Sequence, residues 1–307
     1  MAFTATDVKN LREMTGVGMM DCKKALAASD GDMDKAIEWL REKGMAASAK
    51  KAGRIAAEGM AYAAVIDGVG VVVEVNAETD FVGKNEKFVD FVKGVAATVA
   101  SVNPADLDAL LAAKYMGGEL TVEQQQQEMV LVIGENIKVR RFARFAEGVS
   151  VPYIHAGGKI GVLVNLEVSG EATDKVVEMG KDLAMQIAAL NPSFLDKSQV
   201  DQATLDKERE IQLAIALAEN EKAAKPKPQN IIEKMVDGRM AKYYKENCLM
   251  QQEFVKDSSM TVEQYVASVA KETGLSISLK DAVRFEKGEG IEKKQEDFAA
   301  EIASLVK

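Results

Sequence analysis

The chain has 307 residues, of which 28% are charged, and its 48 Asp and Glu outnumber its 39 Lys and Arg to give a formal net charge of −9. An acidic chain is poorly suited to nucleic acid, because phosphate contacts need clustered Lys and Arg, so we expect no nucleic-acid partner. Two cysteines cannot form a disulfide framework, and no apolar run approaches the length of a membrane span, so we expect a cytoplasmic protein without membrane contact.

The first 44 residues predict a compact module of three short helices. The second helix is expected over 19–28, and Asp32 is placed to cap the third. Gly44 is expected to end that third helix, because glycine favours the left-handed conformation that terminates helices. The basic, alanine-rich stretch 50–54 then predicts a linker to the rest of the chain.

An internal duplication follows. Two segments, 62–76 and 153–167, each predict a β-hairpin around a glycine turn. Each hairpin precedes a helical pattern and then an Asn-Pro pair that stops the helix. The aligned positions are Tyr62 with Tyr153, Gly70 with Gly161, Asn103 with Asn191, and Pro104 with Pro192. We therefore expect two related α+β subdomains, each with a hairpin covered by helices on one face.

The remaining segments predict mainly helices. A helix is expected over 119–135, between the two copies. After the second copy, the helical pattern of 203–221 is interrupted by a Pro-rich turn and resumes, which predicts an antiparallel helical hairpin able to self-associate or to contact the body. The first of these helices has an apolar stripe of Ile211, Ala214, Ile215 and Ala218. A strand over 275–286 and a terminal helix over 292–306 complete the prediction.

The predicted fold class is thus α+β, and the length permits several domains. The expected divisions are 1–54 for the helical module and linker, 55–150 for core subdomain N, 151–195 with 240–286 for core subdomain C, 196–239 for the helical hairpin, and 287–307 for a C-terminal module.

The loop Thr79-Asp80-Phe81-Val82 joins a buried strand to the helix expected to begin near Lys84. In a purely structural interpretation, Thr79 or Asp80 caps that helix and Phe81 packs locally as a hydrophobic staple. In a functional interpretation, the loop presents an aromatic anchor beside an acidic group, which is the composition of an interface hot spot. The residues alone leave both interpretations open.

Catalytic chemistry has little support in the sequence. His155 is the one histidine, so sites that need two histidines are excluded, and no spacing supports Cys22 with His155 as nucleophile and base. The glycine pairs also fail as phosphate loops, because Gly158 and Lys159 are followed by isoleucine where Ser or Thr is needed. We therefore expect no enzyme activity, no catalytic residue, no metal, no cofactor and no direct nucleotide binding.

Several runs closely resemble signatures of the bacterial elongation factor Ts family, in the family's order and over nearly the whole chain. The matching runs are Leu11-Arg12-x-x-Thr15-Gly16-x-Gly18-Met19-Met20-Asp21-Cys22-Lys23-Lys24-Ala25-Leu26, Thr79-Asp80-Phe81-Val82, Gly134-Glu135-Asn136-Ile137, His155 with Ile160-Gly161-Val162-Leu163-Val164, and Arg284-Phe285-Glu286-x-Gly288-Glu289-Gly290-Ile291-Glu292-Lys293.

The resemblance implies a guanine-nucleotide exchange factor that binds elongation factor Tu, both GDP-bound and nucleotide-free, and promotes GDP release during translation. It also implies a ubiquitin-associated-type N-terminal module. The alternative is a translation-associated scaffold or chaperone-like binding protein without exchange activity, which would bind elongation factor Tu or other clients but not speed GDP release.

Partner contacts follow from the same resemblance, position by position. Asp80 and Phe81, within the run from Thr79 to Val82, would wedge between helices of the partner's GTPase domain. The N-terminal module would contact the partner through Lys23, the core through Ile133 and Gly134, and His155 would face the partner's third domain. Gly83 stands where the family is expected to have alanine, which predicts a looser loop.

Overall fold

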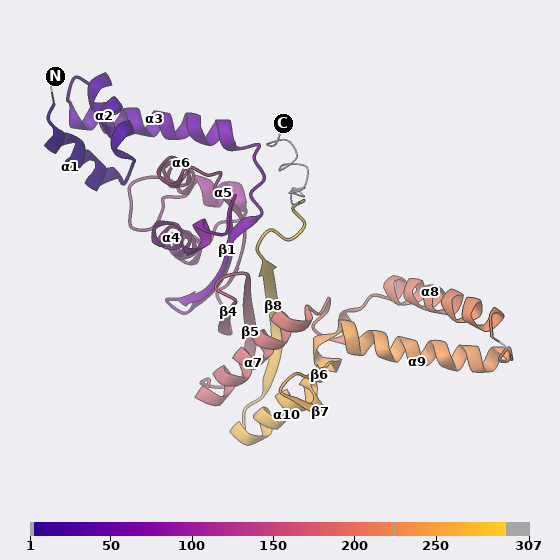
Figure 1. Cartoon of the computed structure of the whole chain (residues 1–307). Coiled ribbons are helices and arrows are strands. Elements are labelled where there is room, and N and C mark those ends of the chain that lie inside the picture. The colour runs from indigo at the N-terminus through magenta and orange to yellow at the C-terminus, as the bar shows by residue number, and fades with distance from the viewer. Residues whose placement is uncertain (1–2, 224, 293–307) are drawn as a thin grey trace. The chain divides into compact units, whose positions relative to one another are not determined.

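The structure, a computed structural model, describes residues 3–223 and 225–292 (Figure 1). These residues form ten α-helices and eight strands, so the chain is α+β as predicted. They divide into two compact units. The first holds the described residues up to Arg144, Ile154–Gly161 and those from Phe285 onward, and the second holds Phe145–Tyr153 and Val162–Arg284.

The first unit begins with the three predicted helices, α1 (Ala5–Thr15), α2 (Met19–Ala28) and α3 (Met33–Lys51). Thr4 caps α1 in a capping box, and Gly16 ends that helix in the left-handed conformation. The helices pack on a small apolar core of their own: Val8, Leu11, Val17, Cys22, Ala25, Leu26, Ala36 and Leu40.

Gly44 does not end α3, which continues to Lys51. A Cβ atom at position 44 would lie 3.2 Å from the carbonyl oxygen of Gln127 in α6 (Val122–Ile133). The glycine therefore lies at a close helix crossing and not at a helix end. The predicted linker over 50–54 therefore begins inside α3, and the helix gives way to a turn at 52–54.

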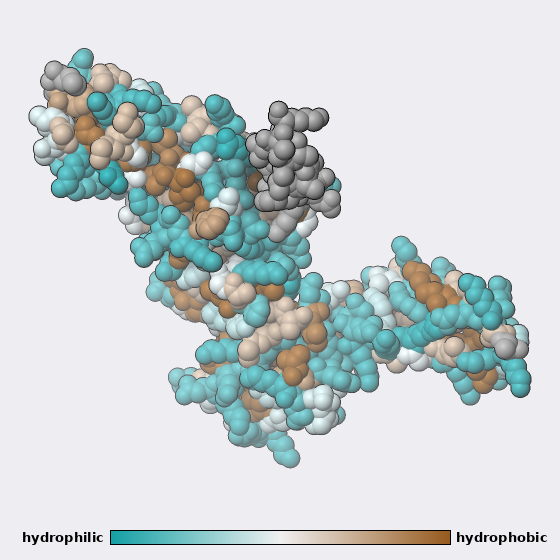
Figure 2. Space-filling model, viewed as in Figure 1, coloured by the Kyte–Doolittle hydropathy of each residue, from teal (hydrophilic) through white to brown (hydrophobic). Residues whose placement is uncertain are grey.

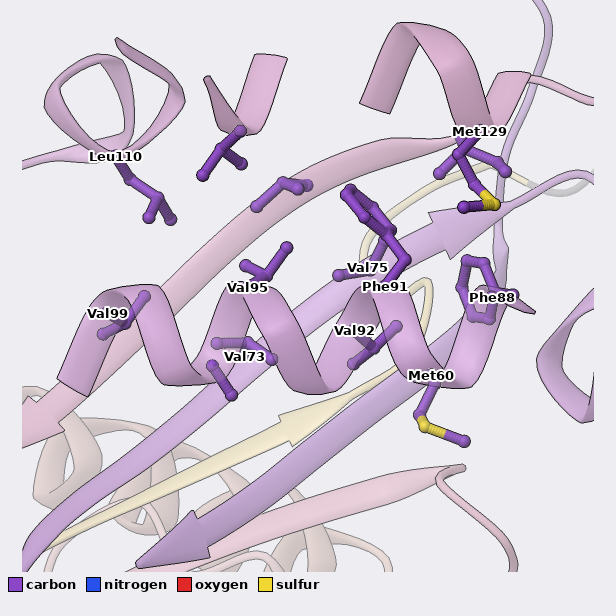
Figure 3. Close-up of a cluster of buried hydrophobic side chains, with 14 of the residues drawn as sticks. Met60, Val73, Val75, Phe88, Phe91, Val92, Val95, Val99, Leu110 and Met129 are labelled. Carbon is purple, nitrogen blue, oxygen red and sulfur yellow. The ribbon is translucent and has the colours of Figure 1, made fainter. Parts of the chain in front are cut away.

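A three-stranded sheet of order β1-β2-β3 follows, from β1 (Glu58–Ile66), β2 (Val69–Ala77) and β3 (Lys138–Phe145). Asp67 and Gly68 connect β1 to β2 with positive φ angles of 50° and 81°, as a two-residue hairpin turn requires. The helices on this sheet are α4 (Glu86–Val102), α5 (Leu107–Ala112) and α6. Figure 3 shows the side chains that form this core, among them Val73, Val75, Phe88, Phe91, Val92, Val95 and Val99.

The second copy has the same plan, which confirms the predicted duplication. Its hairpin is β4 (Val149–His155) with β5 (Ile160–Val168), its helix is α7 (Asp174–Leu190), and β8 (Ile277–Glu286) completes a sheet of order β4-β5-β8. The helices α4 and α7 each have 17 residues. Each ends at an asparagine with positive φ, Asn103 at 51° and Asn191 at 44°, directly before the proline.

The repeat also extends beyond the predicted part. The helices α6 and α10 (Val262–Thr273) each have 12 residues, a threonine capping box and a left-handed glycine at the end. Each then leads into the third strand of its sheet. The sequence Thr-Val-Glu-Gln opens both helices, at 121–124 and 261–264, and Arg-Phe closes both segments, at 144–145 and 284–285. The strand β3 and the helices α5 and α10 were not predicted.

Between α7 and α10, the second unit contains the predicted helical hairpin of α8 (Gln202–Glu221) and α9 (Gln229–Asn247), which run side by side in Figure 1. Phe194 closes its base, because its N–H donates to the carbonyl of Asn247 at 3.0 Å and its carbonyl accepts from the N–H of Leu249 at 2.9 Å. The hairpin core consists of Ala216, Ile232, Val236 and Met240.

Short elements complete the structure: the strands β6 (Glu253–Phe254) and β7 (Asp257–Thr261), and the 3-10 turns η1 (Val82–Lys84), η2 (Lys197–Gln199) and η3 (Leu249–Gln251). The predicted terminal helix over 292–306 lies almost wholly outside the described residues. Within the described part of the chain, no helix is both long and apolar enough to cross a membrane.

Candidate functional site

The loop between β2 and α4 contains the predicted tetrapeptide. Asn85 caps α4, with its side-chain oxygen accepting from the N–H of Lys87 at 3.0 Å. The prediction that Thr79 or Asp80 caps this helix is therefore wrong. The 3-10 turn η1 begins at Val82, the last residue of the tetrapeptide, and leads to Asn85, the true cap.

Phe81 is 81% exposed, more than any other large apolar side chain in the described residues, the next being Met20 at 65%. The hydrophobic-staple interpretation required Phe81 to pack locally, and it is wrong. Its neighbour Val82 is only 5% exposed and lies in the same core as Phe88. Val82 thus anchors the loop to the protein while Phe81 and the exposed Asp80 face outward.

Two carboxylates clamp the loop to the segment that follows α6. Glu135 accepts from the N–H of Thr79 at 2.9 Å and from its hydroxyl at 2.7 Å. In the opposite direction, Glu78 accepts from the N–H of Asn136 at 2.6 Å. Asn136 in turn donates to the carbonyl of Arg54 at 2.8 Å. These bonds link segments 56 or more positions apart and hold the loop in one conformation.

The clamp brings two of the predicted contact positions next to the tetrapeptide. Gly134 ends α6 in the left-handed conformation and is exposed, and it directly precedes Glu135. Ile133 is half-buried against the core of the first unit. The resemblance assigned partner contacts to both, but the clamping role of Glu135 and Asn136 was not predicted.

Gly83 packs closely against β1. It is buried, and a Cβ atom there would lie 2.9 Å from the carbonyl oxygen of Gly59 on β1. Real Cβ atoms essentially never lie so close to another atom, so an alanine would force the loop or β1 to shift. The glycine allows close packing of the loop on the sheet.

A buried charge cluster supports the strand below the loop. Glu74 on β2 is fully buried, and its carboxylate accepts from the N–H of Gly288 at 2.8 Å and from Arg140 at 2.9 Å, as well as from Arg141 and Asn76. Burial favours the protonated carboxyl, but these hydrogen bonds outweigh it and hold the pKa of Glu74 below its ordinary value. The cluster therefore joins β2, β3 and the segment after β8.

The other two predicted contact residues lie on different elements. Lys23 is exposed on α2, and His155 is exposed at the end of β4, before a turn of three residues with positive φ. Cys22 is fully buried in the N-terminal core, and burial raises the pKa of its thiol. A buried, protonated thiol is a poor nucleophile, so the structure gives no support to catalysis by Cys22 with His155.

The arrangement is suited to binding. A phenylalanine ring offers about 150–250 Å² for burial in an interface. Here it is presented by a loop whose conformation is fixed by Val82 and by the two carboxylate clamps. A side chain held ready in this way loses little conformational freedom when it binds, which favours affinity.

The chain is similar to known proteins over almost its full length. The profile of the family described as "Elongation factor TS" matches residues 78–289. The protein "Elongation factor Ts" of Clostridium novyi (strain NT) is 50% identical over 304 residues, covering 97% of each chain. Its namesake in Syntrophotalea carbinolica is 47% identical over 309 residues and covers 100% of both chains. That of Clostridium tetani is 51% identical over 304 residues, 97% of this chain and 98% of the relative.

Proposed function

Because the chain belongs to the elongation factor Ts family of translation elongation factors, we propose that it is a guanine-nucleotide exchange factor for elongation factor Tu. It binds that partner in its GDP-bound and nucleotide-free forms in the cytoplasm and promotes the release of GDP. The observation that carries the proposal is Phe81, an almost fully exposed aromatic side chain on a loop that is otherwise clamped in place.

Exchange of this kind needs no catalytic group. A GTPase holds GDP through backbone donors, a lysine and a Mg²⁺ ion that bridges phosphate oxygens. A protein that binds best to a distorted, GDP-free pocket must weaken GDP binding by the same factor, because coupling between two sites is reciprocal. A coupling of about 3–4 kcal/mol corresponds to a change of about 10²- to 10³-fold in GDP affinity.

Phe81 can supply a coupling of this size. Burial of about 150–250 Å² at about 25 cal/mol per Å² gives an upper value of about 4–6 kcal/mol. If the ring is buried only between displaced helices of the partner, that free energy favours the distorted state alone. Asp80, the exposed residue that precedes Phe81 in the chain, would interact with polar groups exposed by the displacement, while Thr79 and Val82 hold the loop.

The remaining contacts extend the interface. Lys23 offers an exposed cation on α2, Gly134 an exposed helix end beside the clamp, and His155 an exposed ring at a hairpin turn. We propose them, with the half-buried Ile133, as additional surfaces for the same partner. Because rim contacts of this type contribute little free energy individually, they set orientation more than affinity.

Release of fluorescent GDP from purified elongation factor Tu, followed by stopped flow with and without this protein, tests the proposal. We expect the intact protein to accelerate release and Phe81→Ala to lose most of the acceleration while keeping its fold, since the ring is exposed. Val102→Ala, which truncates another exposed apolar side chain at the end of α4, is the matched control and should behave like the intact protein.

Two outcomes would overturn the proposal. Binding to elongation factor Tu without faster GDP release would indicate the scaffold or chaperone-like alternative. Full acceleration by Phe81→Ala would show that exchange, if present, does not depend on this loop.

A further inference from the structure

The N-terminal module, formed by α1, α2 and α3, is packed onto the rest of the first unit along α3. Ala36 and Leu40 of α3 belong to the core of the module, whereas Ala47, further along the same helix, packs against the core on the sheet of β1, β2 and β3. In the other direction, Leu131 and Val132 of α6 pack against the core of the module. Figure 2 shows hydrophobic residues at the boundary between α3 and α6. The module and the rest of the unit therefore share a continuous apolar contact.

Asn136, which follows α6, lies where three segments of the unit meet, and it is only 6% exposed. Its N–H donates to the carboxylate of Glu78, at the start of the loop that presents Phe81, at 2.6 Å. Its side-chain amide donates to the carbonyl of Arg54 at 2.8 Å. The guanidinium of Arg54 lies 3.4 Å from the same carboxylate of Glu78. We call Arg54, Glu78 and Asn136 the junction, because they join the chain just after α3, the loop and the segment after α6.

The charges around the junction hold the same three segments together. Lys51, the last residue of α3, is half-buried, and burial lowers the pKa of its ammonium group below the ordinary value. The carboxylates of Glu78 and Glu135 act in the opposite direction and favour the charged amine. The N–H of Arg54 also donates to the carbonyl of Lys51 at 2.8 Å, which ties the junction to the helix. The end of α3 thus attracts both carboxylates that clamp the loop.

We propose that Asn136 is a positioning residue through which the N-terminal module and the loop that presents Phe81 bind their partner as one surface. This inference rests on the proposed function, in which Lys23 of the module and Phe81 of the loop contact the same protein. Docking of the module fixes the end of α3 on the partner, and the junction then fixes the loop. The ring of Phe81 is thereby held close to its site before it enters, so less conformational freedom is lost when it binds.

A purely structural role for Asn136 predicts a different behaviour. If the residue only stabilised the fold, the module and the loop would bind the partner independently of each other. The effects of changes at independent sites on a rate multiply to within about twofold, whereas the effects at coupled sites depart further from the product. The departure from the product therefore measures the coupling between the module and the loop.

A double-mutant cycle on the full chain measures this coupling through the stopped-flow release of fluorescent GDP from elongation factor Tu. We expect Lys23→Glu and Phe81→Ala together to slow release by a factor at least about fourfold smaller than the product of their separate factors, because either change alone already disrupts the joint docking. In an Asn136→Asp background, the product should hold to within about twofold. Aspartate keeps the shape of asparagine and the backbone bond to Glu78, but its ionised side chain cannot donate to the carbonyl of Arg54.

The concentration dependence of release separates positioning from loss of stability. Asn136→Asp should lower the maximal rate of GDP release at saturating protein by at least about fivefold and change the half-saturating concentration by less than about twofold. A variant that is merely less folded has a smaller active concentration, which raises the half-saturating concentration and leaves the maximal rate unchanged. Asn136→Ala introduces no buried charge and should give the same result, which keeps the test valid should the aspartate variant fold poorly. Asn103→Asp, the same change at an exposed asparagine, is the control and should behave like the intact chain.

Three results would overturn this role of Asn136. They are effects of Lys23→Glu and Phe81→Ala that multiply to within about twofold in the intact chain, equal coupling with and without Asn136→Asp, and a change in the half-saturating concentration alone. Failure of the intact chain to accelerate GDP release would instead overturn the proposed function, and this inference with it.

Discussion

Thr79 donates two hydrogen bonds to one carboxylate, that of Glu135, from its N–H at 2.9 Å and from its hydroxyl at 2.7 Å. This pair connects the loop that presents Phe81 to the end of α6, 56 positions away. An exposed aromatic side chain binds more tightly when its backbone is already in the bound conformation, because less conformational freedom is lost on binding. The Thr79–Glu135 pair is therefore a positioning element for the proposed wedge.

Replacing Glu135 with alanine should slow GDP release while leaving the fold intact. Hydrogen bonds to a charged group contribute about 1.5–3 kcal/mol. If loss of these bonds makes the binding conformation of the loop less favourable by about 1–2 kcal/mol, the catalysed release of GDP slows by about 5- to 30-fold. Stopped-flow release measures the effect, and Glu123→Ala, an exposed position at the start of the same helix, is the control. Unchanged release by Glu135→Ala would show that the clamp does not position the loop.

Removal of the Glu74 carboxylate should strongly destabilise the first unit. Glu74→Ala leaves Arg140, Arg141 and the N–H of Gly288 without their shared acceptor in a buried site. Breaking a buried charge pair in this way costs about 3–5 kcal/mol. Urea unfolding monitored by circular dichroism measures the loss. Glu119→Ala, which breaks an exposed pair with Lys114, should cause a far smaller change, and equal effects would contradict the prediction.

Acid should destabilise the protein through the same carboxylate. The pKa of Glu74 is lower in the folded chain than its ordinary value of 4.5, so the folded state binds fewer protons than the unfolded state in this range. The stabilisation is thus complete above about pH 4.5 and is lost as the pH falls through the folded-state pKa. Urea midpoints between pH 7 and pH 3 should fall more steeply for the intact protein than for Glu74→Gln. Parallel curves would exclude Glu74 as the source.

Two glycines within helices should respond in opposite ways to the same substitution. Gly44→Leu would press a side chain against the carbonyl of Gln127 and should cost about 1–3 kcal/mol. Gly238, within α9, has no neighbour within 4 Å of its Cβ position, so Gly238→Leu should gain up to about 1 kcal/mol from helix propensity. Thermal unfolding of both variants compares them, and a neutral Gly44→Leu would disprove the close helix crossing.

The sequence predicted the repeated part of the fold well, because local signals determine it. Glycine turns, an apolar pattern and an Asn-Pro stop occur twice in the same order, at Asn103 and again at Asn191. It failed at Gly44, where glycine serves a contact with a helix 83 positions further along, at Gln127. From the sequence alone, a glycine that ends a helix cannot be distinguished from a glycine that allows close contact with another helix.

The sequence predicted the exposed residue of the candidate site, Phe81, but not the hydrogen bonds that hold its loop in place. Phe81 was identified together with its neighbours, but hydrogen bonds from distant segments fix the loop, and no local pattern reveals them. One signal was visible. Glu74 interrupts a run of valines on a strand expected to be buried, and a charge in such a place needs a partner of opposite charge. The sequence does not show which of the arginines provides it.

The base of the helical hairpin has a practical consequence. Its two ends meet at Phe194, whose backbone forms hydrogen bonds with Asn247 at the end of α9 and with Leu249 at the start of η3. The segment between these points, which contains α8 and α9, therefore begins and ends at adjacent positions of the second unit. The helical hairpin can therefore become longer or shorter, or be replaced, without rearranging the repeated sheets. For the same reason, a reporter domain can be inserted in place of the hairpin.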